Sequence, residues 1–176
     1  FTCALLDTGA VRCWGYSGFW GSLGYPNVDQ VRAPAEIGDV DIGGEVVAID
    51  AGAAHTCGSA YDGMRCWGGA FDGVLGYGNL ENIGDDEPPS AVGPIELNGW
   101  AIGPIAAGTY GTCVVRGEFH EVIKCWGAGF GDDELPGGVL GIILDTPIAS
   151  LDLGNQHGCV VLEGGAVRCW GTNVDG

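Results

Sequence analysis

The sequence predicts an all-β fold made of several copies of one hairpin-containing unit, and three observations support this. First, the chain of 176 residues contains 35 Gly and 8 Pro, and each glycine inside a helix costs about 1 kcal/mol. Second, no stretch shows the i, i+3, i+4, i+7 spacing of an amphipathic helix. Third, one cysteine-containing pattern occurs four times. A hydrophobic content of 46% supplies enough apolar surface for a folded core, so disorder is not expected.

The repeated pattern predicts four β-hairpins. Each copy contains two cysteines and ends in an apolar residue, a basic residue, Cys, Trp and Gly. We expect the hairpins near residues 1–15, 55–68, 111–127 and 157–171. The copies are unevenly spaced, so insertions of different length must lie between the hairpins.

The segments between the hairpins predict further short strands. Glycine-rich turns are followed by Leu23-Gly24-Tyr25 and Leu75-Gly76-Tyr77, whereas the third copy keeps only Leu140-Gly141. Apolar stretches that end in Ala-Gly, at 46–52 and 102–108, precede the second and third hairpins. Each repeat is therefore expected to contain several short strands.

The complete cycle, H-T-C-x-L…G-x-V-x-C-W-G…L-G-Y-G…V-x-x-I-x-A-G, resembles the bacterial, cysteine-bearing form of the RCC1 (regulator of chromosome condensation) repeat. The resemblance covers residues 1–176 as a single array. It implies β-propeller blades of antiparallel strands, usually closed into a ring. About three repeats plus one hairpin are too few for such a ring, so we expect an open arc or part of a larger propeller.

The eight cysteines fall into four pairs that straddle predicted turns. The pairs are Cys3/Cys13, Cys57/Cys66, Cys113/Cys125 and Cys159/Cys169. Zinc sites favour about two to four residues between cysteines, which these pairs exceed, and unbonded buried thiols are the other alternative. We interpret the pairs as four disulfides, each stabilising its hairpin by about 2 to 3 kcal/mol. This interpretation implies an extracellular, periplasmic or cell-surface location.

The six tryptophans divide into a repeated and a non-repeated set. The repeated set, for which we expect packing between neighbouring blades, is Trp14, Trp67, Trp126 and Trp170. Trp20 and Trp100 lie in variable segments, where they are candidates for an exposed contact patch. Packing in a small satellite core is the alternative for these two residues.

The sequence offers no candidate catalytic set. His55 and His157 share one repeat position and are interpreted as structural, and His120 lies at a predicted loop tip. The cysteines that could act as nucleophiles are already assigned to pairs. We therefore predict that the protein is not an enzyme.

Two acidic clusters are weak candidates for calcium binding, and we expect no other cofactor. The clusters are Asp85, Asp86 and Glu87, and Asp132, Asp133 and Glu134. Calcium prefers six to eight oxygen ligands. Neither cluster matches the D-x-[DN]-x-[DN]-G loop, so plain solvated loops are the alternative.

Charge and hydropathy exclude two classes of partner. Six Lys and Arg residues against 23 Asp and Glu residues give a net charge of −17, which disfavours nucleic acid and anionic membrane surfaces. No apolar run reaches the roughly 18 to 20 residues needed for membrane insertion. The chain has no initiator Met and opens in a predicted strand, so we interpret it as a processed or partial chain.

The sequence is compatible with three functions of different classes. The first is a non-catalytic extracellular protein-binding or scaffold module, with the variable segments 18–34 and 79–100 as contact loops. The second is a structural subunit of an extracellular fibre or surface layer, which assembles through exposed blade edges. The third, nucleotide exchange as in the eukaryotic namesake of the family, is disfavoured by the paired cysteines and the acidity.

Overall fold

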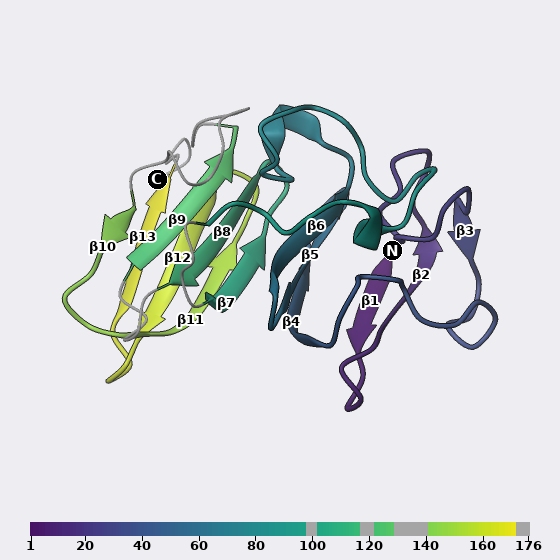
Figure 1. The fold of residues 1–176 in the computed structure, drawn as a ribbon. Coiled ribbons are helices and arrows are strands. Elements are labelled where there is room, and N and C mark those ends of the chain that lie inside the picture. Colours follow the sequence, from purple (N-terminus) through teal and green to yellow (C-terminus); the bar gives the residue numbers. More distant parts are fainter. Residues whose placement is uncertain (98–101, 117–121, 129–140, 172–176) are drawn as a thin grey trace.

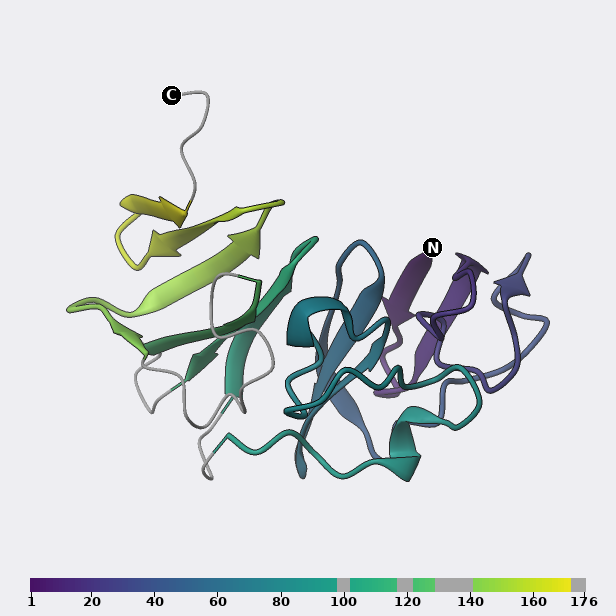
Figure 2. The ribbon, with the colours of Figure 1, turned by 90° about the horizontal axis from the view of Figure 1, so that it is seen from above.

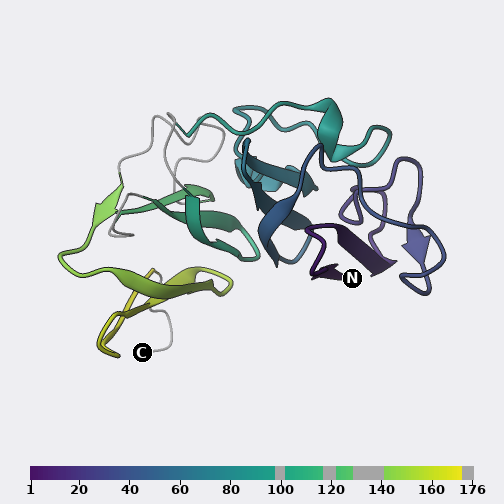
Figure 3. The same ribbon diagram turned by 60° about the horizontal axis from the view of Figure 1, so that its bottom comes forward.

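The chain forms four small antiparallel β-sheets that follow one another in the order of the sequence (Figure 1). They are seen in a computed structural model that describes residues 1–97, 102–116, 122–128 and 141–171. Figures 2 and 3, which view the ribbon from other sides, show the sheets side by side along a curve. The all-β prediction is therefore confirmed, with the blades in an open arc.

Each sheet contains one of the cysteine hairpins. The first sheet consists of β1 (Thr2–Leu5), β2 (Val11–Tyr16) and β3 (Gln30–Val31). The second consists of β4 (Val46–Ala51), β5 (His55–Ala60) and β6 (Gly63–Gly68). The third consists of β7 (Ile102–Ala107), β8 (Gly111–Arg116), β9 (Val122–Gly127) and β10 (Ile142–Ile143). The fourth consists of β11 (Ile148–Leu153), β12 (His157–Leu162) and β13 (Val167–Gly171).

The outer edge of the blades is the least regular part. The outermost strands β3 and β10 have two residues each, and in the second blade Ile83 forms only an isolated bridge to Gly68. The described helices are two single 3-10 turns, η1 (Phe71–Gly73) and η2 (Pro89–Ala91). Neither helix is long or apolar enough to cross a membrane, and the structure describes no other.

The glycine of each Cys-Trp-Gly allows the two hairpin strands to meet closely. Gly68 lies opposite His55 and has a φ of 112°, which favours glycine. A Cβ at Gly68 would lie 2.4 Å from the carbonyl oxygen of Ala54. The same position in the other copies is also at positive φ, so the repeat requires glycine there for conformation and for space.

The core runs between the blades. Strand β7 contacts β4 on one side and β11 on the other. One buried cluster extends from Val11 in the first blade to Trp126 in the third, and a second cluster joins Val115 to Val160 of the fourth. Each blade therefore buries its apolar faces against its neighbours.

Candidate functional site

The eight cysteines form four disulfides, each within one hairpin. The bonded pairs are Cys3–Cys13, Cys57–Cys66, Cys113–Cys125 and Cys159–Cys169. Partners are directly opposite each other, with Cα–Cα distances of 4.0 to 4.1 Å. Such short distances are typical of non-hydrogen-bonded pairs in antiparallel sheets. All eight cysteines lie in the described segments and none is free, which fits a non-reducing setting.

At two of these hairpins, a tyrosine hydroxyl bonds to the backbone N–H of the second cysteine, which no strand covers. At a non-hydrogen-bonded pair, the backbone N–H of the second cysteine points away from its partner strand. The Tyr25 hydroxyl accepts from the Cys13 N–H at 3.2 Å and donates to the Gly38 carbonyl at 2.9 Å. The Tyr77 hydroxyl accepts from the Cys66 N–H at 3.4 Å, and burial raises its pKa to about 12. The sequence motif Leu-Gly-Tyr thus has a role that pattern alone did not indicate.

The second and third blades are joined by a buried hydrogen-bond network. The Val74 carbonyl accepts from the Thr112 hydroxyl at 2.7 Å and from the Trp126 indole N–H at 2.9 Å. Because the Thr112 hydrogen goes to Val74, His55 Nε2 must donate to Thr112 Oγ1, at 2.8 Å. Burial lowers the pKa of His55 to about 4, so its ring is neutral at pH 7. We call these four residues the blade latch.

Equivalent contacts recur along the arc. In the first blade, the Ser22 carbonyl accepts from the Thr56 hydroxyl at 3.2 Å, as Val74 does from Thr112. The turns beside the inner strands are linked by backbone bonds, from Ala53 N–H to the Gly108 carbonyl at 3.2 Å and from Thr109 N–H to the Gly154 carbonyl at 3.4 Å. The arc is therefore held by one type of junction used repeatedly.

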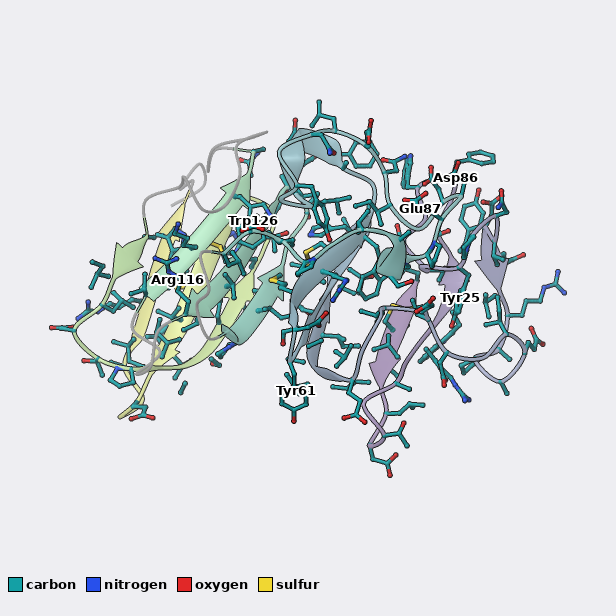
Figure 4. The ribbon with its side chains drawn as sticks, in the orientation of Figure 1. Tyr25, Tyr61, Asp86, Glu87, Arg116 and Trp126 are labelled. Atoms are coloured by element: carbon teal, nitrogen blue, oxygen red, sulfur yellow. A yellow bond between two sulfur atoms is a disulfide. The ribbon has the colours of Figure 1, made fainter. Side chains whose placement is uncertain are left out.

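The repeated tryptophans differ in burial. Trp67 and Trp126 are completely buried, whereas Trp14 and Trp170 are partly exposed. Figure 4 shows Trp126 on the side of the third sheet that faces the second. Trp100 lies outside the described residues.

Trp20 belongs to an exposed aromatic surface between the first two blades. Tyr16 at the end of β2, together with Phe19 and Trp20 in the loop that follows, lines an open cavity of about 270 Å³. Trp20 meets the exposed Phe71 of the second blade edge to face, with ring centroids 5.1 Å apart. We call these four residues the aromatic groove. Sequence reasoning selected only Trp20, although the cluster of aromatic residues in a glycine-rich turn was a further signal.

The first acidic cluster lies directly beside this loop. The carboxyl oxygens of Asp85, Asp86 and Glu87 lie within 4.8 Å of one another (Figure 4). Partial burial, followed by the bond to Asp86, raises the pKa of the Glu87 carboxyl. Three carboxylates can supply part of the six to eight oxygens that calcium prefers, so calcium binding at this cluster stays a prediction. The second cluster, Asp132, Asp133 and Glu134, lies outside the described residues.

The described residues assemble no nucleophile with a base. His55 bonds to Thr112, which is engaged with a carbonyl. His120 lies outside the described residues. Among the described residues, His55 and Thr112 are therefore both committed to the blade latch.

Comparisons with known proteins agree with this architecture. Residues 148–176 match the sequence profile of the regulator of chromosome condensation (RCC1) repeat, and no curated protein sequence matches the chain. The solved structure of human WBSCR16 superposes with a TM-score of 0.70 at 18% identity, covering 96% of this chain and 44% of that one. Yeast RCC1 (Prp20) bound to Kap60 gives 0.64 at 19% identity, covering 93% and 40%.

Plant receptor proteins share the fold as well. The ectodomain of the Physcomitrella patens receptor kinase CR4 gives a TM-score of 0.57 at 20% identity, covering 97% of this chain and 36% of that one. The chain thus spans less than half the length of these three structures. The repeat match and the shared fold lead to one conclusion: residues 148–176 are similar to an RCC1 repeat, and the chain has the fold of RCC1-like β-propeller blades with four hairpin disulfides.

Proposed function

We propose that this chain is a non-catalytic protein-binding module that works outside the reducing cytosol, at a cell surface or in an extracellular or periplasmic space. The observation that carries the proposal is the contrast between the buried tryptophans of the repeat and the exposed aromatic residues of the loop after β2. Trp67 and Trp126 are fully buried between blades, whereas 44% of Trp20 and 78% of Phe19 are exposed. Exposed aromatic residues on a rigid frame are typical of protein contact surfaces.

Solved relatives support this choice of function. Yeast RCC1 was solved bound to Kap60, and a structure of yeast Prp20p is described with its binding to Gsp1p and histones. The ectodomains of two plant receptor kinases have the same fold. Together with the four disulfides, these relatives favour protein recognition in an oxidising setting.

The test uses the purified, disulfide-bonded chain. Partners cross-linked to it in its native compartment are identified, purified and titrated against it by calorimetry. We expect a saturable one-to-one complex that is lost when the disulfides are reduced and alkylated. Labelling of most cysteines by alkylation without prior reduction, in freshly lysed source cells, would contradict the proposal.

Self-assembly is the second candidate, because the last blade carries exposed apolar side chains. Val161 and Val167 are 37% and 62% exposed. Light scattering over a range of protein concentrations separates the two functions. A constant particle mass supports the binding module, whereas growth into rods or sheets supports a fibre or surface-layer subunit.

A further inference from the structure

The aromatic groove combines four exposed rings from two blades. Tyr16, Phe19 and Trp20 line one cavity, and Phe71 lies against Trp20 with its ring nearly perpendicular, at 87°. Because Phe71 meets Trp20 edge to face, the two rings are fixed relative to each other while 44% of each remains exposed. The groove is therefore a preformed surface of ring faces and edges.

The size of the cavity favours a side chain of a larger partner over a free small molecule. Its volume of about 270 Å³ is below the roughly 300 to 1,000 Å³ of most small-molecule sites. The other lining residues are Phe1 and four small residues, Ser17, Gly18, Ser22 and Ala53. A single long side chain that projects from a protein segment would fill this space.

Acidic residues surround the groove. Asp72 directly follows Phe71, and Asp29 is bonded through its backbone carbonyl to Ser17 in the cavity wall. The acidic cluster is anchored to the same loop, because the Asn27 N–H donates to the Asp85 carbonyl at 2.6 Å. A Cβ at Gly21, the residue after Trp20, would lie 2.3 Å from the Asp85 nitrogen. Acidic residues of both blades therefore lie on the segments that border the groove.

Three arginines of the chain are already paired with carboxylates. Arg12, Arg65 and Arg168 occupy the same repeat position, and each pairs with a carboxylate. The described residues that line the cavity carry no charged side chain of either sign. A cation placed on the aromatic faces would therefore face a net negative surround.

We propose that the aromatic groove binds a basic protein segment, with an Arg or Lys side chain held against Trp20 and its neighbours and the acidic cluster attracting the flanking charges. A cation over an aromatic face gains about 0.5 to 2 kcal/mol, with Trp the best partner. Arg also stacks its planar head on rings, so Arg should bind more tightly than Lys. This inference rests on the proposed protein-binding function and names the chemistry of the partner.

The test is fluorescence anisotropy with a labelled peptide of alternating Arg and Gly. The purified disulfide-bonded chain should bind it more tightly than peptides of alternating Lys and Gly, Ser and Gly, or Glu and Gly. Phe19→Ala combined with Trp20→Ala should weaken binding about tenfold. The matched control is Tyr61→Ala, since Tyr61 is 85% exposed and lies well away from Asp86 and Glu87 (Figure 4). Melting temperatures and unreduced mass spectra verify that each variant is folded.

A second pair of variants tests the role of the acidic cluster, and the two variants have the same net charge as each other. Asp86→Asn should weaken binding about threefold, whereas Glu96→Gln, which removes one exposed carboxylate elsewhere, should not. Equal losses of affinity in a variant and its matched control, equal binding of the Ser and Gly peptide, or displacement of the Arg peptide by a neutral oligosaccharide would overturn the inference.

If a purified native partner binds the Phe19 and Trp20 double variant normally, the inference fails while the protein-binding function stands. If the chain polymerises yet still binds the Arg peptide through the groove, the inference stands while the proposed protein-binding function fails.

Discussion

His55 illustrates how much a single side chain contributes to the fit between blades. Its ring is completely buried, and it donates to a hydroxyl that is itself committed to the Val74 carbonyl. Protonation would place a charge in this apolar junction, which explains why the pKa of His55 is lowered to about 4. The blade latch is therefore sensitive to acid.

We expect acidification to cost stability through this residue. Between pH 6.5 and about 4, the unfolded chain takes up a proton on His55 that the folded chain refuses, so the free energy of unfolding falls by about 3 kcal/mol. Urea unfolding of the wild type and of His55→Gln, at pH 7 and pH 4.5, measures this. Gln keeps a donor for Thr112 but does not titrate, so the variant should lack this part of the pH dependence. His157→Gln, at the exposed equivalent position, should behave like the wild type.

A second prediction at this scale concerns Gly68. Alanine at this position would need a left-handed backbone and would bring its Cβ to 2.4 Å from a carbonyl oxygen. We expect Gly68→Ala to lower the free energy of unfolding by at least about 2 kcal/mol. Gly93→Ala is the control because a Cβ there meets nothing within 4 Å. Similar melting temperatures for the two variants would show that the close approach at Gly68 is unimportant.

At the scale of elements, the blades differ in how they complete their outer edge. Where β3 and the Ile83 bridge are too short to cover the cysteine strand, Tyr25 and Tyr77 supply the missing hydrogen-bonding group. In the third copy Ile142 stands at the tyrosine position and pairs with β9 as part of β10. A tyrosine hydroxyl thus bonds to the cysteine strand in two copies, whereas in the third copy a short strand pairs with the start of that strand.

Tyr25→Phe tests this exchange. The variant leaves the Cys13 N–H and the Gly38 carbonyl without their partner, and we expect a loss of about 1 to 3 kcal/mol in thermal or urea unfolding. Tyr77→Phe should cost less because its bond to the Cys66 N–H is longer, at 3.4 Å. Tyr61→Phe, on the exposed β5–β6 turn, should cost nothing measurable. Equal free energies of unfolding for all three variants would mean that the hydroxyls of Tyr25 and Tyr77 do not stabilise the fold.

The elements also show how far the sequence was informative. The hairpin strands followed from the cysteine spacing, because directly opposite positions in an antiparallel ribbon are symmetric about the turn. The acceptors at these junctions did not, since Val74 and Ser22 accept through backbone carbonyls, and the identity of a side chain does not reveal that role. The aromatic groove was found only in part, because Phe71 reaches Trp20 through the stacking of two blades.

For the whole molecule, stability depends on the junctions between neighbours. The blades contact one another in sequence order, and the latch at the second junction contains the bridging hydroxyl of Thr112. Removing this hydroxyl leaves the His55 donor buried without an acceptor. The second and third blades would then keep the bond from Trp126 to Val74, the backbone bond from Ala53 to Gly108 and their apolar packing.

We therefore expect Thr112→Val to lower the free energy of unfolding by about 2 kcal/mol, with faster amide hydrogen exchange in β5 and β8. Thr112→Ser keeps the hydroxyl and should restore most of the loss. Thr8→Val, on an exposed turn, controls for the change in β propensity. Exchange that accelerates equally in β1 and β2 would indicate general destabilisation rather than an opened junction.

The backbone bonds from Ala53 to Gly108 and from Thr109 to Gly154 have an evolutionary consequence. Main-chain groups form these links, so the side chains of Ala53 and Thr109 can change without breaking them, while Gly52 and Gly108 leave the space that the accepting carbonyls need. The third copy has Gly111 where the second has His55, and the fourth has Gly158 where the third has Thr112. Repeats could therefore be added to the array, or the loops between hairpins exchanged, without changes in the other blades.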